Sequence, residues 1–359
     1  MNPPGLVTRP EDVTSAFLTD VLNYAGINAK VEHFTQGNVG TGQVGQNVRF
    51  QMTYATDSDP SAPASIVGKF CSDDEVSRQT GVGLANYLRE VRFYQELRAS
   101  LDIQTPKVLF TDINPETHQF VLMMEDLAPA VQGNQLEGCS VADVKLGLQE
   151  LAKLHGPRWA DESLFDLEWL PRPDPDAGVT IAGLYNQLFP GFVERYGSRL
   201  NQTHIDLGKH LGDNFARHVA NGNRDHAMTV THGDYRLDNT MFGGPYPLAV
   251  VDWQSPTIGN NGQDLAYWVG TSLPSDIRRK SDRALVEHYY QSLTHYDVGD
   301  YSLEQCWLDY RQFAFSGWNM AVIASMIVGQ TDRGDDMFMV MANRSAQMAT
   351  DLESLNLLD

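Results

Sequence analysis

The spacing of hydrophobic residues changes along the chain, and this change separates two regions of different structure. Val48, Phe50 and Met52 alternate with polar residues, a period of two that is typical of a half-buried strand. Later segments such as 277–295 repeat apolar residues every three or four positions, as amphipathic helices do. A strand-rich region followed by a mostly helical one predicts an α+β fold.

The pattern also gives approximate positions for the individual elements. Strands in the first region are expected at 31–35, 48–54, 65–70, 107–111 and 119–124, with helices at 10–26 and 83–99. Helices in the second region are expected at 140–155, 181–196, 205–220, 277–295, 303–328 and 335–355. The strand at 119–124 is nearly all apolar, which predicts that both of its faces are covered.

A glycine-rich segment lies between the first two strands. Gly40, Gly42 and Gly45 form the pattern G-x-G-x-x-G. In dinucleotide-binding folds this pattern opens a helix, because the pyrophosphate binds at the helix N-terminus. Here a period-two strand follows, which favours a hairpin whose backbone can fold over phosphates. A flexible turn without a ligand and a dehydrogenase built on these glycines are the alternatives.

Three polar residues in the second region have the chemistry of phosphoryl transfer. Asp234 and Asn239 share one polar loop, and Asp252 follows a buried strand at 248–251. Transfer from ATP uses one carboxylate to accept the proton of the acceptor hydroxyl and two oxygen ligands for Mg²⁺. Each residue alone could be an ordinary turn former. His232, Asp234 and Asn239 fit the H-x-D-x-x-x-x-N pattern of kinases, and with Asp252 after the next strand the set favours the catalytic interpretation.

The His-Gly-Asp motif that ends at Asp234 and the Asp-Trp-Gln motif that starts at Asp252 resemble the aminoglycoside phosphotransferase superfamily. This superfamily includes choline kinase-like and ecdysteroid kinase-like enzymes. Arg236 and Leu237 differ from the residues often found there in drug-modifying members. That difference favours the ecdysteroid kinase-like group over kinases that modify aminoglycosides.

The resemblance implies a bilobal protein-kinase-like fold. The N-lobe, residues 1–127, would hold a small antiparallel sheet, and the C-lobe, residues 128–359, would be larger and mainly helical. Lys69 matches the third-strand lysine that reaches the nucleotide phosphates. Glu90 would form an ion pair that orients this lysine, and Glu96 is its competitor.

The resemblance also implies how the nucleotide and the metal bind. The backbone of an inter-lobe hinge would hold the adenine ring, and the hinge residues are Glu125, Asp126 and Leu127. ATP would lie between the lobes, with Mg²⁺ on Asn239 and Asp252. Asp234 would orient the acceptor hydroxyl and accept its proton.

Two further polar residues are expected to have structural roles. Asp264 stands near the start of a helix, where it can cap that helix or brace the catalytic loop. His155 ends the helix at 140–155 and is expected to be a buried hydrogen-bonding residue rather than a catalyst.

Composition narrows the class of protein and its partners. The formal net charge of −20 over 359 residues disfavours binding to nucleic acid or to an anionic membrane. Cys71, Cys139 and Cys306 are far apart and odd in number, as expected for reduced thiols in a cytoplasmic protein. The N-terminus has no signal-peptide pattern. Polar residues interrupt the apolar stretch 313–328, which favours a buried helix over a membrane span.

The sequence therefore predicts an ATP- and Mg²⁺-dependent phosphotransferase that acts on a hydroxyl of a small molecule. A nucleotide-binding pseudokinase or regulatory module is the main alternative. The complete set of Lys69, Asp234, Asn239 and Asp252 argues against it, because a binding module does not need the base. No Ala-Pro-Glu segment follows Asp252, so a protein substrate is not expected. A sterol-like alcohol, a hydroxyacyl thioester, a sugar and an aminoglycoside all remain open as acceptors.

Overall fold

The computed structural model describes residues 2–40, 45–222 and 227–358, and the chain divides into two compact units. Unit 1 consists of Met1–Ala99, Thr105–Ala130 and Val251–Ser255. Unit 2 consists of Ser100–Gln104, Val131–Val250 and Pro256–Asp359. Each unit thus contains a short segment from a distant part of the chain. Asp252 belongs to unit 1, whereas Asp234 and Asn239 belong to unit 2.

Unit 1 is built on a five-stranded antiparallel sheet with the strand order β1-β2-β3-β5-β4. Its strands are β1 (Val31–Asn38), β2 (Gly45–Tyr54), β3 (Ser65–Cys71), β4 (Val108–Ile113) and β5 (Phe120–Glu125). All five predicted strands are present, and the α+β fold class is confirmed. Because β1 and β2 are antiparallel neighbours, the glycine-rich segment joins two paired strands, as a hairpin does.

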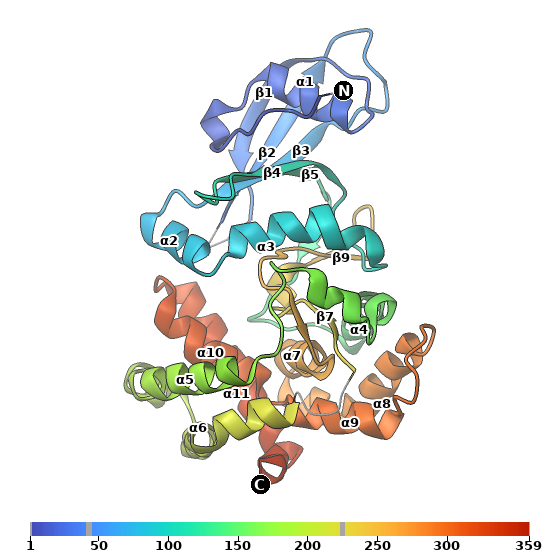
Figure 1. Ribbon diagram of the computed structural model, residues 1–359. Helices are drawn as coiled ribbons and strands as arrows, with labels where there is room; N and C mark the ends of the chain where they lie inside the picture. The colour runs from blue at the N-terminus through green and yellow to red at the C-terminus, as the bar shows by residue number, and fades with distance from the viewer. Residues whose placement is uncertain (1, 41–44, 223–226, 359) are drawn as a thin grey trace. The chain divides into compact units, whose positions relative to one another are not determined.

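One face of this sheet is covered by α1 (Ser15–Tyr24), which lies along it in Figure 1. Phe17 and Val21 of α1 share an apolar core with Phe50 of β2 and Phe70 of β3. Burial of each such side chain stabilises the fold by about 1.5–3 kcal/mol. Thr14 caps the helix, since its Oγ1 accepts a hydrogen bond of 3.1 Å from the Phe17 backbone amide.

The opposite face is covered by α3 (Asn86–Arg92). Tyr87 and Val91 of α3 pack against Phe120 and Leu122 of β5, and the Tyr87 and Phe120 rings are stacked 5.0 Å apart. Alternate residues of β5 contribute to the two cores, so this strand is buried on both faces as predicted.

The prediction of a single helix at 83–99 is wrong. A first helix, α2 (Glu75–Gly83), precedes the break, α3 follows it, and the chain continues as a π-helical segment over Phe93–Leu97. Ala85 has a left-handed backbone with φ +55°, which ends one helix and redirects the next. Leu84, expected in the core, is 53 % exposed. The prediction failed because two glycines weaken the helix signal of α2, and nothing local marks Ala85 as left-handed.

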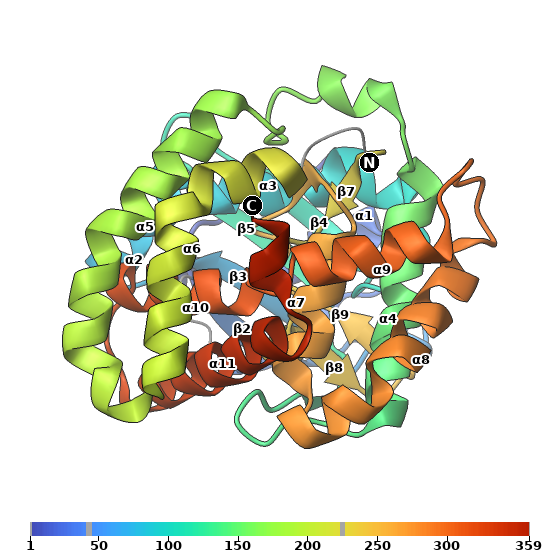
Figure 2. The ribbon, with the colours of Figure 1, turned by 90° about the horizontal axis from the view of Figure 1, so that it is seen from below.

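Unit 2 is mainly helical. Its helices are α4 (Val141–His155), α5 (Pro175–Tyr196), α6 (Gln202–Gly222), α7 (Gly262–Ser272), α8 (Ser275–Leu293), α9 (Leu303–Gln312), α10 (Ser316–Ile327) and α11 (Asp332–Asp351). Figure 2 shows α5 and α6 side by side and α7 among the other helices. Every residue of α7 from Asp264 to Ser272 is buried, so this helix forms the centre of the unit.

Short strands in unit 2 flank the loop that carries Asp234 and Asn239. They are β6 (Val131–Gln132), β7 (Thr229–Thr231), β8 (Thr240–Phe242), β9 (Leu248–Val250) and β10 (Thr257–Gly259). β7 pairs with β10, and β8 lies between β6 and β9. The loop that carries Asp234 and Asn239 therefore leaves one small sheet and enters another.

The prediction of one continuous helix at 303–328 is also wrong, because this segment forms two helices. It is divided at Phe313–Phe315 into α9 and α10, and the Ser316 hydroxyl donates to the Phe313 carbonyl at 2.8 Å. The apolar pattern continues through the break, because Ala314 and Phe315 are buried, so periodicity could not reveal it. None of the described helices combines the length and apolar character needed to cross a bilayer.

Candidate active site

The charged cluster in unit 1 is centred on Lys69. Its ammonium Nζ lies 2.7 Å from Oε2 of Glu90 and 2.6 Å from Oδ1 of Asp252. Lys69 is 6 % exposed and Glu90 is 1 % exposed. Burial lowers the pKa of Lys69, but the carboxylates of Asp252 and Glu90 outweigh it, so the net shift is upward. Glu96, the predicted competitor, instead pairs with Arg92 at 2.7 Å.

Local geometry explains why Lys69 and Glu90 meet. Lys69 lies on the face of β3 that α3 covers, because residues at alternate strand positions share a face. Gly45 of β2 lies beside this lysine, and a Cβ there would be 3.0 Å from Lys69 Cε. Gly40 has φ +76°, a conformation that glycine adopts without strain, while Gly42 lies outside the described residues.

Asp252 has a left-handed backbone with φ +66°. This conformation costs a residue with a side chain about 1–2 kcal/mol and persists only where its surroundings enforce it. The adjacent Trp253 is fully buried, and its ring is stacked on Phe93 at a centroid distance of 3.9 Å and an interplanar angle of 3°. Phe93 begins the π-helical segment, a feature often found near functional sites. The buried tryptophan thus fixes the backbone on which the Asp252 carboxylate is mounted.

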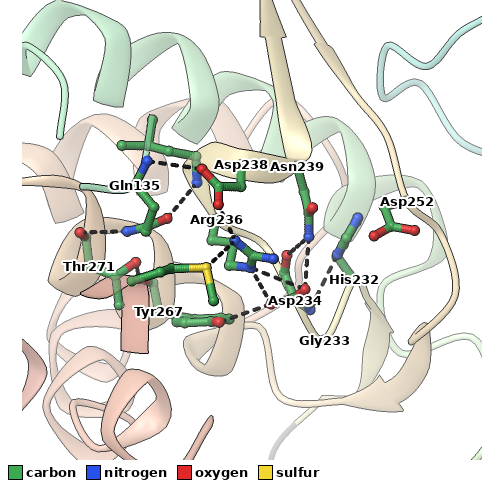
Figure 3. Close-up of polar contacts among 12 residues, drawn as sticks. Gln135, His232, Gly233, Asp234, Arg236, Asp238, Asn239, Asp252, Tyr267 and Thr271 are labelled. Atoms are coloured by element: carbon green, nitrogen blue, oxygen red, sulfur yellow. Dashed lines mark hydrogen bonds and ion pairs between the residues drawn. The ribbon is translucent and has the colours of Figure 1, made fainter. Parts of the chain in front are cut away.

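In unit 2, three side chains hold the Asp234 carboxylate (Figure 3). The Tyr267 hydroxyl of α7 donates to Oδ1 at 2.9 Å, and Arg236 Nε lies 3.0 Å from Oδ1 and 3.2 Å from Oδ2. Asn239 Nδ2 donates to Oδ2 at 2.8 Å and to the Asp234 backbone carbonyl at 2.9 Å. Burial raises the pKa of Tyr267 first, and the Asp234 charge raises it further.

The contacts of Asn239 orient its amide. Both hydrogen bonds use Nδ2, so Oδ1 points away from these acceptors. No hydrogen bond to Oδ1 is present in the part of the chain that the structure describes. The predicted partners Asp234 and Asn239 are therefore in direct contact, and an amide oxygen remains for a ligand.

Asp264 braces the same loop from α7. Its Oδ2 accepts the His232 amide at 2.6 Å and its Oδ1 accepts the Gly233 amide at 3.0 Å. Gly233 has φ +78°, which suits the turn. His155 is fully buried between Tyr289, whose hydroxyl is 2.7 Å from Nδ1, and Asp264, whose Oδ2 is 3.4 Å from Nε2. The predicted structural roles of Asp264 and His155 are confirmed.

A second brace was not predicted from the sequence. The buried Gln135 accepts the Leu237 amide at Oε1 (3.0 Å) and donates from Nε2 to the Thr271 carbonyl (2.8 Å), while its backbone amide donates to Asp238 Oδ1 (3.0 Å). Nearby Gly133 permits close approach, since a Cβ there would lie 2.4 Å from the Leu237 carbonyl oxygen. This segment has no periodic pattern, so the sequence offered no signal beyond its polar character.

Two arginines near the loop were also not predicted as site residues. Arg236 Nη1 lies 3.0 Å from Asp238 Oδ2, and Arg333 of α11 contacts both oxygens of Asp238 at 3.1 Å. Burial alone would raise the pKa of Asp238, but its bonds to Arg333 and the charge of Arg236 lower it overall. Asp238 thus stays ionised and connects the loop to α11.

The side chains of the proposed hinge have partners within unit 1. The Asp126 carboxylate accepts Arg49 Nη2 at 2.9 Å and the Ser65 hydroxyl at 2.6 Å. Glu125 Oε1 accepts the Lys107 amide at 2.7 Å, and Leu127 is buried. Adenine binding by these three residues would have to use their backbone, and this role stays a prediction.

Three solved structures show that the chain has a bilobal kinase-like fold. APH(2″)-IIa in complex with gentamicin matches 94 % of this chain and 99 % of its own, at 14 % identity and a TM-score of 0.51. The GDP complex of wild-type aminoglycoside 2′-phosphotransferase-IIIa matches 93 % and 99 %, at 13 % identity and a TM-score of 0.51. Ethanolamine kinase from Plasmodium vivax matches 87 % and 81 %, at 11 % identity and a TM-score of 0.51.

At these identities the likeness shows the fold alone. The model of the ecdysteroid kinase-like family matches residues 42–297, more than half of the chain, and the chain belongs to this family. A sequence search of curated proteins gave no match.

Proposed function

We propose that the protein is an ATP- and Mg²⁺-dependent phosphotransferase that moves the γ-phosphoryl group to a hydroxyl of a small molecule. The observation that carries the proposal is the contact between Asp234 and Asn239, which combines a held carboxylate with an available amide oxygen on one loop. Membership of a kinase-like family supports the same reaction class.

Asp234 would orient the acceptor hydroxyl and accept its proton. Tyr267, Arg236 and Asn239 fix the carboxylate before an acceptor arrives, so little reorganisation is needed during the reaction. Lys69, aligned by Glu90, would bind the nucleotide phosphates, and the hairpin with Gly40, Gly42 and Gly45 would cover them. The N-lobe, with its hinge at Glu125, Asp126 and Leu127, would hold the adenine ring.

Asn239 and Asp252 would hold Mg²⁺. Their oxygens suit this hard cation, which commonly binds one or two carboxylates and completes its shell with water and phosphate. Among the described residues no group of three or more His, Cys, Asp or Glu side chains could hold a metal ion, so an all-protein cage is not the kind of site expected. The unit 1 cluster contains two carboxylates and one ammonium, a charge excess that a cation would offset. When bound, Mg²⁺ neutralises charge on the phosphates.

The proposal is tested with γ-labelled ATP, Mg²⁺ and a deproteinised metabolite extract. Asp234→Asn removes the proposed base, and Asp213→Asn, an exposed site on α6, is the matched control. Transfer of label to a small molecule by the wild type and Asp213→Asn, but not by Asp234→Asn, is expected. If the protein binds ATP but releases no label from it, the result would instead favour a nucleotide-binding pseudokinase or regulatory module.

A further inference from the structure

Gln254 contacts one of the two residues that are proposed to hold Mg²⁺. Its side-chain Nε2 donates a hydrogen bond of 3.0 Å to Asp252 Oδ2, while Lys69 Nζ lies 2.6 Å from the other oxygen, Oδ1. All three residues belong to unit 1. The Asp252 side chain is 26 % exposed. Its carboxylate is therefore held at both oxygens and still accessible to a ligand.

The amide of Gln254 is held in one orientation. A carboxylate paired with an ammonium only accepts hydrogen bonds, so the amide has to present its NH₂ group to Asp252. The amide oxygen, Oε1, is buried and has no hydrogen-bond partner among the residues that the structure describes. Such buried acceptors destabilise a fold and are rare in native proteins. The orientation of this side chain thus serves the contact with Asp252 rather than the hydrogen bonding of its own amide.

The backbone supports the same contact. Trp253, which separates the two residues, is fully buried, and its ring is stacked on Phe93. One buried anchor therefore fixes the chain between Asp252 and Gln254 and keeps their side chains within reach of each other.

Gln254 differs in charge from the arginine that holds the proposed base. The guanidinium of Arg236 compensates the charge of Asp234. An amide is neutral, so Gln254 can fix the Asp252 carboxylate and leave its negative charge available to a cation. The other donor to Asp252 is the ammonium of Lys69, which the proposed function also assigns to the nucleotide phosphates.

We propose that Gln254 is a positioning residue for the Mg²⁺ site and keeps the Asp252 carboxylate in place while the Lys69 ammonium is shared with the nucleotide phosphates. The inference rests on the proposed function, in which Asp252 is a metal ligand. Loss of a residue that orients a metal ligand typically weakens metal binding by tenfold to about 100-fold. Gln254→Leu should therefore weaken the binding of Mg²⁺ with the nucleotide.

This role can be tested without turnover. A non-hydrolysable ATP analogue is titrated by calorimetry into wild type and Gln254→Leu over a range of Mg²⁺ concentrations. Gln254→Leu should need about tenfold more Mg²⁺ for half-maximal binding. At saturating Mg²⁺ its affinity for the analogue should lie within about threefold of the wild type. Gln79→Leu is the matched control, because Gln79 also donates to a carboxylate, Glu75 Oε1 at 2.7 Å, but on the exposed surface of α2.

Chemical denaturation of the same variants separates positioning from a structural role. Gln254→Leu removes the unpartnered oxygen together with the bond to Asp252, so its unfolding midpoint should not fall below that of the wild type. An unchanged Mg²⁺ requirement in Gln254→Leu overturns the inference, and a lowered midpoint with that result assigns the residue a structural role. Wild-type protein that does not bind the analogue in a Mg²⁺-dependent way counts against the proposed function itself.

Discussion

Unit 1 contains a cluster of charged side chains around Lys69, and unit 2 contains one around Asp234. Both clusters hold proposed site residues in place, but they are built differently. In unit 1, the buried ammonium of Lys69 is shared by two carboxylates, of which Glu90 is buried and Asp252 is partly exposed. In unit 2, a partly exposed carboxylate is held by a guanidinium, a phenol and an amide. Backbone hydrogen bonds to Asp264 and Gln135 fix the surrounding loop.

This difference predicts different responses to substitution. Loss of one partner in unit 1 leaves a buried charge without compensation, so stability and function should fall together. Loss of one donor in unit 2 leaves the others in place, so turnover should change more than stability. The predictions below follow from this comparison.

The largest effect is expected for Lys69→Met. It leaves Glu90 buried without its cation, which should lower the free energy of unfolding by about 3–5 kcal/mol and reduce turnover by at least about 100-fold. Chemical denaturation and the label-transfer assay measure the two effects. Lys30→Met, at an exposed lysine of unit 1, is the control. The double variant Lys69→Met with Glu90→Leu should regain stability without activity. Recovery of activity by that double variant would contradict the role of Lys69.

Gln135→Leu, in unit 2, should lower both the stability of the protein and its turnover. It removes the acceptor of the Leu237 amide and the donor to the Thr271 carbonyl, both at a fully buried position. The Thr271 carbonyl keeps a second donor, Arg344 Nη1 at 2.8 Å, but the Leu237 amide loses this acceptor, which should lower the free energy of unfolding by about 1–3 kcal/mol. Because the loop position changes, turnover should fall as well. Gln291→Leu on the exposed face of α8 should leave both quantities unchanged. Wild-type turnover in Gln135→Leu would show that the segment does not position the loop.

Tyr267→Phe should change turnover and little else. It removes one donor to Asp234 Oδ1 while Arg236 and Asn239 still hold the carboxylate. A hydrogen bond to a charged group contributes about 1.5–3 kcal/mol, so kcat should fall roughly tenfold to 100-fold, with the ATP affinity unchanged. Steady-state kinetics and calorimetric titration with ATP separate these effects. Tyr24→Phe, at a half-exposed tyrosine, is the control. An equal loss of ATP affinity would argue that Tyr267 is structural.

The sequence could predict those parts of the site that depend on local spacing. Asp234 and Asn239 belong to one short loop, and the face of β3 that carries Lys69 follows from strand alternation. Gln135, Tyr267 and Arg333 come from distant segments, and no spacing within their own segments marks them as partners of the loop.

The errors in the fold have a related cause. Helical periodicity located both ends of 303–328 to within one residue but continued through the break at Phe313–Phe315; for 83–99 it missed α2 and began the helix before the break at Ala85. A single left-handed residue or a turn within an apolar stretch depends on tertiary packing, which the pattern of apolar residues does not record.

A final, pH-dependent effect on stability is expected from His218 of α6. Burial lowers the pKa of this histidine from 6.5 to about 4. Between these values the unfolded chain binds a proton that the folded chain does not, so stability falls as the pH drops through this range. The loss at pH 5 relative to pH 7 should be about 2 kcal/mol from this residue.

His218→Asn tests this prediction. Asparagine can still accept from Gln312 Nε2, which lies 3.2 Å from His218 Nδ1, but it does not titrate. The variant should lose about 2 kcal/mol less stability than the wild type between pH 7 and pH 5 in denaturant titrations. His33→Asn, on an exposed strand position of unit 1, should behave as the wild type. Parallel pH profiles of wild type and His218→Asn would contradict the prediction.

The most direct test of the central claim compares ATP affinity with turnover in Asp234→Asn. If Asp234 acts on the acceptor hydroxyl and Lys69 binds the nucleotide, this variant should bind Mg²⁺–ATP within about threefold of the wild type. Its label transfer should fall at least about 100-fold, the range of general-base effects. Calorimetric titration and the label-transfer assay on the same protein preparation give both numbers. Near-wild-type transfer by Asp234→Asn, or a parallel loss of ATP affinity, would contradict the account.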